Sequence, residues 1–556
     1  MSNVRSGGRI LIDQLVVHGT ELVFCVPGES YLAALDALHD TPQIRLVVGR
    51  MEAGTANMAC AHGQLTGSPA IFFATRGPGA TQASVAVHSA RQGSVGMIMF
   101  VGQVPREHRD REAFQEVDLD AMFAPLAKWT ATIDCAERIP EYVSRAYRVA
   151  AAGRPGPVVL ALPEDVLVQN ADVVDAAPYQ IVRPSPPARA VARVRDMLLR
   201  AQRPLVVVGG GGWSDRAAAD TVAFCESWGV PLATAFRCQD YVDNRSPVYC
   251  GTLGLGIDPQ LARRVQESDL LLVIGARLDE PTTGGYTIIQ APRPRQALIH
   301  VHADPEELGH VFEPTLGINA GSAEFAEAAR ALAPPEPARW GAWTASAASD
   351  LAVFRTPGEV ADGVDLARAV SGICDALGPE AIVTNGAGNY TLWVHRYWRF
   401  SRFGCQLAPV SGAMGYGVPA AIAAKLAEPA RPVVSFSGDG CFMMACQELA
   451  TAVRHDAAVV FVVVDNASYG TIRMHQERRY PGRRVGTDLV NPDFVALAGS
   501  FGIDARSVAD ADDLVAAVVA GVERDEPSLV HVPLSPEILT PPRATPGAAR
   551  EDAAVA

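Results

Sequence analysis

Short runs of branched apolar residues, each followed by a longer helix-like stretch, recur along most of the chain. The clearest runs read LVFCVPG, PAIFFATRGPGA, GMIMFVG, PLVVVGGGG, DLLLVIGAR, QALIHVHAD, AIVTNGAG, PVVSFSGDG and AVVFVVVDN. Continuous apolar strands that alternate with helices are typical of parallel sheets buried on both faces. The sequence therefore predicts an α/β fold built from doubly wound parallel sheets.

Two Pro-rich stretches, near residues 172–189 and 331–340, interrupt this pattern and have the composition of linkers. They divide the chain into three parts, for which we predict the boundaries 1–172, 190–333 and 360–540. The remaining residues, 541–556, are rich in Pro and Ala and show no apolar periodicity. They predict a flexible tail.

The charge balance argues against nucleic-acid and membrane partners. Lys and Arg total 47 against 61 Asp and Glu, which gives a formal charge of −14 and opposes attraction to anionic polymers or lipids. No apolar run reaches the ~20 residues of a membrane helix, and the N-terminus lacks a signal-peptide core. The ten Cys show no metal-ligand spacing, so we expect reduced core residues and a cytoplasmic location.

The strongest local signal lies in the third part. One predicted strand ends in Gly438, Asp439 and Gly440, and the next ends in Asp465 and Asn466. Because the carboxyl ends of parallel strands share one edge, Asp439 and Asn466 can converge there. Carboxylate and amide oxygens suit Mg²⁺, and the glycines with the following helix N-terminus suit a diphosphate. An ordinary strand–helix turn is the alternative.

This segment resembles the thiamine-diphosphate signature, in which GDG is followed by 25 intervening residues and then Asn. The resemblance implies the cofactors thiamine diphosphate and Mg²⁺. It assigns the metal to Asp439, Asn466 and the carbonyl of Ser468, and it adds Gly438, Gly440 and Cys441 to the cofactor contacts.

Two further segments match the same family. RLVVGRMEAGTANMACAHG places Glu52 between a strand and a small-residue helix, and the resemblance implies that Glu52 protonates the aminopyrimidine ring. Taken alone, a Glu at a helix start is more often a surface residue. In QLAPVSGAMGYG, Met414 resembles the apolar residue that bends the cofactor, with Gly412 and Met414 contacting the pyrimidine; the alternative is a glycine-rich helix start with Met as filler. The NGAGN loop is expected over the diphosphate, with residues Gly386, Ala387, Gly388 and Asn389.

The stretches that begin at Thr75 and Gly102 are similar to acetolactate synthase and its relatives. By that resemblance Phe114 and Gln115 line the active site and Gln103 lies nearby, although Phe114 can equally be core and Gln115 a loop amide. Glu29 is expected to face the thiazolium, either as a second acid–base group or as a solvated loop charge. Its role and the substrate therefore stay open.

The resemblance implies an acetolactate-synthase-like carboligase acting on a small 2-oxo acid or acyl substrate. A 2-hydroxyacyl- or oxalyl-CoA-type lyase, or a 2-oxo acid decarboxylase, is the alternative, and a non-catalytic binding relative is the third reading. The paired His of pyruvate decarboxylases is absent, which favours a carboligase or lyase. In this family the acidic residue and the metal site meet across a subunit interface, so we expect a homodimer or homotetramer.

The middle part resembles the family's nucleotide-binding domain, which binds FAD or ADP in some members. Its glycine-rich strand ends are a weak signal, and His302 stands where FAD-binding relatives often have Asp. FAD, ADP and a vestigial fold all remain open, and Arg277 can meet a carboxylate or a phosphate. The basic segment 473–486 is interpreted as a lid for an anionic substrate or as a solvated loop.

Overall fold

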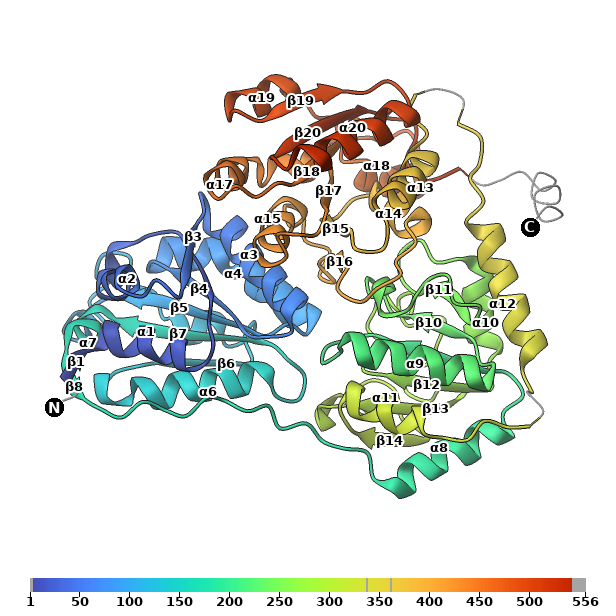
Figure 1. Ribbon diagram of the computed structural model, residues 1–556, viewed down its shortest axis with the longest axis horizontal. Coiled ribbons are helices and arrows are strands. Elements are labelled where there is room, and N and C mark those ends of the chain that lie inside the picture. The colour runs from blue at the N-terminus through green and yellow to red at the C-terminus, as the bar shows by residue number, and fades with distance from the viewer. Residues whose placement is uncertain (1–3, 337–338, 361–362, 543–556) are drawn as a thin grey trace. The chain divides into compact units, whose positions relative to one another are not determined.

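The computed structural model describes residues 4–336, 339–360 and 363–542. Within them lie three six-stranded sheets whose neighbouring strands are all parallel, and a small antiparallel pair of β1 (Val4–Ser6) and β8 (Asn170–Asp172) (Figure 1). The predicted α/β fold with three doubly wound sheets is therefore confirmed. Most of the predicted flexible tail, from residue 543 on, lies outside the described residues.

The chain divides into two compact units. The first unit contains residues 1–182, 409–429 and 445–457, and the second contains 183–408, 430–444 and 458–556. The first unit thus includes two short segments from the last third of the sequence. The second unit contains both the middle and the last sheet.

The first unit is built on a sheet with the order β3-β2-β4-β5-β7-β6. Its central strands are buried along their whole length, as their apolar runs predict. Helices cover both faces (Figure 1), and α15 packs against α3. The strands are β2 (Leu22–Cys25), β3 (Arg45–Val48), β4 (Ala70–Ala74), β5 (Met97–Gln103), β6 (Trp129–Thr132) and β7 (Pro157–Pro163). The helices are α1 (Gly7–Val17), α2 (Leu32–His39), α3 (Glu52–Thr66), α4 (Gly77–Gly93), α5 (Leu119–Phe123), α6 (Ile139–Ala151), α7 (Glu164–Val168), α15 (Gly417–Ala427) and α17 (Leu449–Arg454).

The middle sheet has the order β11-β10-β9-β12-β13-β14. Alternate residues of its strands enter two separate cores, since successive side chains of a strand point to opposite faces. Helices α8, α9 and α11 supply one core, α10 supplies the other, and α12 contributes to both. The strands are β9 (Pro204–Val208), β10 (Leu232–Thr234), β11 (Tyr249–Thr252), β12 (Leu270–Ile274), β13 (Ala297–His302) and β14 (Leu316–Asn319). The helices are α8 (Ala188–Arg200), α9 (Asp215–Trp228), α10 (Pro259–Glu267), α11 (Ser322–Arg330) and α12 (Gly341–Phe354).

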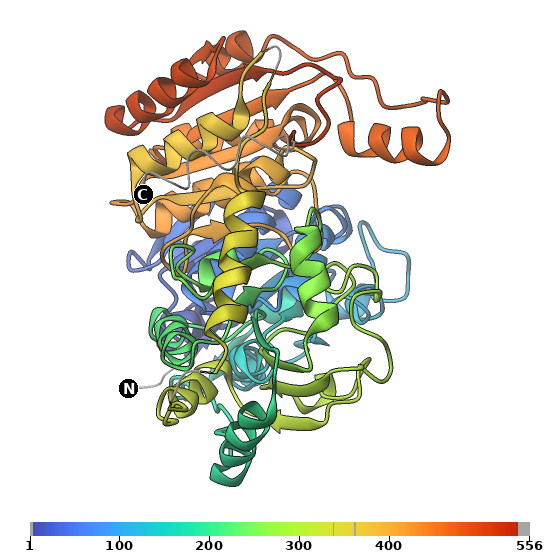
Figure 2. The same cartoon turned by 90° about the vertical axis from the view of Figure 1, so that its right-hand side faces the viewer.

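The last sheet has the order β16-β15-β17-β18-β20-β19. Helices α13 and α20 pack together beside it, while α18 and the loop that follows it stand out from the sheet (Figure 2). The strands are β15 (Ile382–Asn385), β16 (Gln406–Leu407), β17 (Val433–Gly438), β18 (Val460–Asp465), β19 (Asp504–Ser507) and β20 (Ser528–Pro533). The helices are α13 (Leu366–Leu377), α14 (Thr391–Tyr397), α16 (Asp439–Met443), α18 (Gly470–Arg479), α19 (Phe494–Ser500) and α20 (Ala511–Arg524).

In each sheet the chain first winds toward one edge and then reverses to build the other side. The reversal falls between β2 and β4 in the first sheet, between β9 and β12 in the middle sheet, and between β15 and β17 in the last sheet. Ligands of open α/β sheets bind outside the carboxyl ends of the strands at this point. The glycine-rich segments at 386–389 and 438–440 follow the two strands that flank the reversal of the last sheet.

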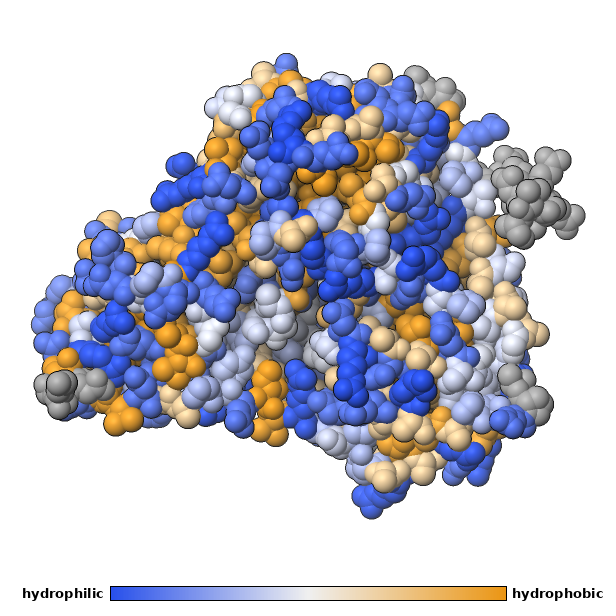
Figure 3. All heavy atoms as spheres, viewed as in Figure 1, coloured by the Kyte–Doolittle hydropathy of each residue, from blue (hydrophilic) through white to orange (hydrophobic). Residues whose placement is uncertain are grey.

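The surface seen in Figure 3 is mostly hydrophilic and is interrupted by apolar patches. In the described part of the chain, no helix is long and apolar enough to cross a membrane.

Candidate functional site

Three segments that are distant in sequence meet at the carboxyl edge of the last sheet. Gly386–Asn389 follows β15, Gly438–Gly440 spans the end of β17 and the start of α16, and Asn466–Ser468 follows β18. Because β15, β17 and β18 are neighbours in this order, their ends lie side by side. The structure therefore brings together the residues predicted for the metal and the diphosphate.

Asp439 is the first residue of α16 and is only 3% exposed. Its Oδ2 accepts a hydrogen bond of 2.8 Å from Nδ2 of Asn491, and the same nitrogen donates to Oδ1 of Asp465 at 2.7 Å. Oδ2 of Asp465 lies 3.1 Å from Nε2 of His531. Asn491 thus holds the carboxylates of Asp439 and Asp465 beside each other, and the His531 ring contacts the carboxylate of Asp465.

The two carboxylates have opposite pKa shifts. Burial raises the pKa of Asp439 to about 6, and the neighbouring Asp465 acts in the same direction. Burial also acts to raise the pKa of Asp465, but hydrogen bonds from His531, the Ala467 amide and Asn491 outweigh it and lower this pKa. A cation beside Asp439 would offset its burial cost, because opposite charge favours the ionised form.

The oxygen atoms at this edge fit Mg²⁺. Oδ1 of Asn466 accepts from the Ser468 amide at 3.2 Å, and the Ser468 carbonyl accepts from the Gly470 amide at 2.8 Å. Each oxygen keeps a second lone pair, so a carboxylate, an amide and a carbonyl oxygen are available, as Mg²⁺ prefers. In the described residues no group of three His, Cys, Asp or Glu side chains forms a metal cluster. This site instead needs amide, backbone and phosphate oxygens.

Tyr390 connects the loops around the diphosphate position. The Gly386 amide donates to its hydroxyl at 3.0 Å, and that hydroxyl lies 3.5 Å from Sγ of Cys441. A Cβ atom on Gly438 would lie 3.0 Å from the Tyr390 ring. Glycine at 438 therefore leaves room for this aromatic contact. The sequence pattern gave no sign of Tyr390 or of Asn491, since neither lies in a recognisable motif.

Glu52 begins α3 in the first unit, directly after the turn that follows β3. It is half-buried. A Cβ atom on Gly79 would lie 2.9 Å from its Oε1, so the carboxylate sits beside the first turn of α4. Glycine at position 79 keeps this space open.

Glu448 fixes the backbone that leads into Glu52. It is fully buried, and its carboxylate accepts from the amides of Arg50 at 3.2 Å and Met51 at 3.0 Å and from the Thr451 hydroxyl at 2.6 Å. Burial raises its pKa. A residue nearly 400 positions further along the chain therefore positions this turn, and the sequence showed it only as part of a helix-like stretch.

The predicted pyrimidine-contact loop also lies in the first unit. Gly412 has φ of +69°, a conformation that favours glycine, and its amide donates to the Pro409 carbonyl at 2.9 Å. The Ser411 hydroxyl lies 3.0 Å from that of Ser89 on α4. Met414 is half-buried in the loop before α15. The loop is thus attached to the same helix that Glu52 contacts.

The other predicted residues of the first unit have different surroundings. Gln103 is buried, and its Nε2 donates to the Val117 carbonyl at 2.8 Å. The Gln115 carbonyl accepts from the amide of Gly77 at the start of α4, at 3.0 Å. Phe114 is 71% exposed, and Glu29 is exposed in a short 3₁₀ turn.

In the middle sheet, His302 is buried and its Nδ1 accepts from the Asp304 amide at 3.0 Å. Arg277 forms an ion pair with Asp279 at 3.4 Å. A Cβ on Gly275 would lie 2.5 Å from the Gly209 carbonyl. These glycines therefore serve close backbone packing, whether or not a nucleotide binds beside them.

Three doubly wound sheets, with polar loops gathered where the last one reverses, are typical of ligand-binding α/β proteins. Comparison with known proteins identifies the class more closely. Family models for the thiamine pyrophosphate enzymes match the N-terminal TPP-binding domain at residues 5–122, the central domain at 191–329 and the C-terminal TPP-binding domain at 386–532.

Relatives match over almost the whole chain. The acetolactate synthase large subunit of Parasynechococcus marenigrum is 32% identical over 95% of this chain and 87% of its own length. The isozyme 1 large subunit of Escherichia coli is 30% identical over 98% of this chain and 97% of its own. The large subunit of Corynebacterium glutamicum is 29% identical over 98% and 90%. The chain belongs to the thiamine pyrophosphate enzyme family and is a thiamine-diphosphate-dependent enzyme.

Proposed function

We propose that this chain is an acetolactate-synthase-like carboligase that forms a carbon–carbon bond between 2-oxo acids. The observation that supports this most is the convergence of Asp439, Asn466 and the loop 386–389 where the last sheet reverses. Similarity to acetolactate synthases over nearly the full length supports the same reaction class.

Each predicted residue has a specific task in this proposal. When bound, thiamine diphosphate supplies an electron sink next to a carbonyl carbon. Glu52 hydrogen-bonds N1′ of the aminopyrimidine and holds or gives up the proton there. Met414 and Gly412 orient the pyrimidine. This orientation raises the effective concentration of the reacting groups. Gln115 and Glu29 are proposed beside the substrate.

The diphosphate and its metal are assigned to the last sheet. Asp439, Asn466 and the Ser468 carbonyl would hold Mg²⁺, whose remaining positions suit phosphate oxygens. The cradle of the diphosphate consists of Gly386, Ala387, Gly388, Asn389, Gly438, Gly440 and Cys441. The burial of Asp439 supports this assignment, because a buried carboxylate gains from a bound cation.

The minimum active assembly is proposed to be a homodimer, with a homotetramer as the larger form. Large apolar side chains stay exposed close to the metal segment and along α18 and the loop that follows it. They are Met443, Met444, Ile472, Tyr480, Val485 and Val490. Contiguous exposed apolar side chains mark interaction sites. The relatives are named large subunits, so a second kind of subunit is the other proposed occupant.

For the middle sheet we propose a nucleotide, FAD or ADP, at its carboxyl edge. The glycine-rich turns after β9 and β12 flank the point where this sheet reverses, which supports a ligand there. The buried His302 and the ion-paired Arg277 would be its nearest polar groups. A visible absorption spectrum of the purified protein distinguishes bound FAD from ADP or an empty fold.

The test of the main proposal uses purified protein with thiamine diphosphate and Mg²⁺. Pyruvate alone should give 2-hydroxy-2-methyl-3-oxobutanoate, and pyruvate with a second 2-oxo acid should give the 2-hydroxy-3-oxo acid that carries the acceptor's alkyl group on C2, each with release of carbon dioxide. Aldehyde formation without carboligation would indicate a decarboxylase. Turnover of 2-hydroxyacyl- or oxalyl-CoA, with no product from pyruvate, would indicate the lyase alternative and overturn the proposal.

A further inference from the structure

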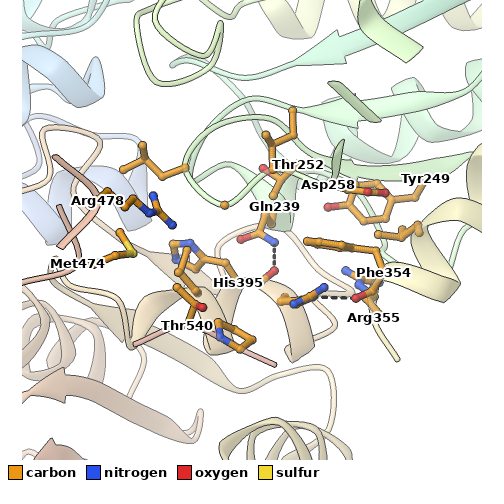
Figure 4. Close-up of a pocket in the computed structure, with 18 residues that line it drawn as sticks. Gln239, Tyr249, Thr252, Asp258, Phe354, Arg355, His395, Met474, Arg478 and Thr540 are labelled. Atoms are coloured by element: carbon orange, nitrogen blue, oxygen red, sulfur yellow. Dashed lines mark hydrogen bonds between the residues drawn. The ribbon is translucent and has the colours of Figure 1, made fainter. Parts of the chain in front are cut away.

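A cavity of about 280 Å³ lies within the second unit, between elements of the middle and the last sheet (Figure 4). Its walls come from β11 and the loop after it, the end of α12, α14, α18 and residues 540–541. None of the residues proposed above for thiamine diphosphate or Mg²⁺ lines it. The cavity therefore shares no residue with the site proposed for thiamine diphosphate and Mg²⁺.

Most of the cavity wall is apolar. The apolar side chains come from four different elements and loops, and they are Leu255, Ile257, Leu351, Phe354, Leu392 and Met474. Small-molecule sites are typically concave, mostly apolar and equipped with a few placed polar groups. The volume lies near the lower limit of such sites, about 300 Å³. It suits a small molecule with an apolar body.

The charged groups of the cavity are mainly positive. Arg355, Arg396 and Arg478 line it, against the single carboxylate of Asp258. Burial, the largest effect, and the nearby Asp350 raise the pKa of Asp258. Three guanidinium groups in one cavity of a chain with a net charge of −14 favour an anionic occupant.

The three arginines differ in what they already bind. Nε of Arg396 donates to the Phe354 carbonyl at 2.7 Å, and Nη2 of Arg355 donates to Oδ1 of Asn244 at 2.8 Å. Among the residues that the structure describes, the exposed side chain of Arg478 forms no hydrogen bond or ion pair. In Figure 4 it lies on the opposite side of the cavity from Tyr249 and Arg355. Its donors are available to a ligand.

We propose that this cavity binds a small organic carboxylate with an apolar body, and that Arg478 holds the carboxylate. A single available guanidinium matches the planar, two-oxygen geometry of a carboxylate. A phosphate dianion would keep more negative charge against an apolar wall, where charge is costly without pairing.

The cavity also touches the predicted cofactor loop. Nδ2 of Asn389 lies 3.5 Å from Sδ of Met474 and donates to the Leu539 carbonyl at 2.7 Å. Met474 lines the cavity, and Leu539 precedes the lining residue Thr540. The occupant therefore lies one side chain away from the loop assigned to the diphosphate. It is either the 2-oxo acid substrate, in which case the proposal rests on the proposed function, or a separate carboxylate.

The test is calorimetry on the protein loaded with thiamine diphosphate and Mg²⁺, with 4-methylpentanoate as the probe. This acid has an apolar body and no carbonyl beside its carboxylate, so it cannot enter the proposed reaction. Arg478→Ala should weaken binding about tenfold to a hundredfold, the range for a lost hydrogen bond to a charged group. Arg478→Lys should retain part of the affinity, because the charge remains but the fork is lost.

Arg479→Ala is the matched control, because it removes the same charge from the next residue of α18, which is exposed and does not line the cavity. It should leave the affinity for 4-methylpentanoate unchanged. Leu255→Trp replaces an aliphatic side chain of the cavity wall with a bulkier aromatic one and should also reduce binding. Absence of binding, equal losses in Arg478→Ala and Arg479→Ala, or binding of inorganic phosphate in preference to the acid would each overturn the proposal.

If calorimetry shows that Arg478→Ala has lost binding, steady-state kinetics distinguish the two possible occupants, the 2-oxo acid substrate and a separate carboxylate. If the occupant is the substrate, this variant raises KM for the 2-oxo acid and leaves kcat near that of the unmodified chain. If it is a separate carboxylate, KM stays unchanged and 4-methylpentanoate alters turnover only in the unmodified chain. The binding measurement needs no turnover, so failure of the carboligase proposal leaves it interpretable.

Discussion

Buried acidic residues do different things in this protein because their neighbours differ. Asp439 accepts from the Asn491 amide and the Gly440 backbone and has a second acid beside it, whereas Glu448 accepts two backbone amides and a hydroxyl. The first arrangement leaves negative charge incompletely matched and suits a cation. The second is fully satisfied and suits a structural role, since buried polar groups are normally hydrogen-bonded.

Glu448→Ala should lower the free energy of unfolding by about 2–4 kcal/mol, because two buried amides lose their acceptor. It should also reduce turnover, since the turn before Glu52 loses its support. Glu448→Gln is the control: its Oε1 can still accept from Met51 and Arg50. Urea unfolding of both variants measures the effect. Equal stabilities of the Ala and Gln variants would contradict the assigned role.

Glu52→Gln should remove most turnover and leave thiamine diphosphate binding largely intact, because an amide fills the same space but cannot exchange the proton at N1′. Steady-state assays and calorimetric titration with the cofactor measure the two effects separately. Retention of full turnover would refute the proton-transfer role of this residue.

Asp439→Ala should weaken Mg²⁺ and cofactor affinity at least tenfold, because the site loses the only charged side chain among the proposed ligands. The Mg²⁺-dependent rise in Tm, recorded with and without thiamine diphosphate, measures it. An Asn491→Ala variant keeps every proposed ligand and should retain more of that rise. A wild-type response in Asp439→Ala would exclude Asp439 as a ligand.

At the scale of helices and strands, the sequence predicted which strand ends form the site in the last sheet, but not all of the residues that surround it. Gly438–Gly440 and Asn466 could be located because each follows a continuous apolar strand, and parallel strands share one carboxyl edge. Asn491 and Tyr390 come from a loop and from the residue before α14. Their positions depend on how distant segments pack, which local patterns do not encode. The inclusion of residues 445–457 in the first unit also depends on how distant segments pack.

Helix α18 is tied to the segment that follows β20. Arg473 is only 4% exposed, donates to the Pro536 carbonyl at 3.1 Å and pairs with Glu537. Arg473→Ala should therefore speed amide hydrogen exchange in residues 534–542 by about tenfold or more, since one lost charge-assisted hydrogen bond corresponds to about 1.5–3 kcal/mol. Arg479→Ala serves again as the control. Unchanged exchange in Arg473→Ala would show that other contacts hold this segment.

At the scale of the whole second unit, a buried polar contact joins the middle and the last sheet. Oδ2 of Asp240 accepts from the amides of Cys405 at 3.0 Å and Gln406 at 3.1 Å. The neighbouring Gln239 amide donates to Oε1 of Gln406 at 2.9 Å. The middle sheet is therefore connected to the edge strand β16 by specific hydrogen bonds as well as by apolar packing.

This contact predicts a pH dependence of stability. Burial raises the pKa of Asp240 from 3.8 to about 7, although the hydrogen bonds from Gln406 and Cys405 act to lower it. As the pH rises between these values, the unfolded chain releases this proton first while the folded chain retains it. The contribution to folding is therefore greatest below pH 3.8 and is lost as the pH approaches 7.

Asp240→Asn has no proton to release, so its free energy of unfolding should fall less over this interval than that of the unmodified chain. The difference between the two curves should be on the order of 4 kcal/mol, since each pKa unit corresponds to about 1.4 kcal/mol. Urea unfolding at a series of pH values measures it, and subtraction removes the groups common to both proteins. Parallel curves would mean that Asp240 ionises in the folded chain as it does in the unfolded one. The bond between the sheets would then be made by a charged carboxylate throughout.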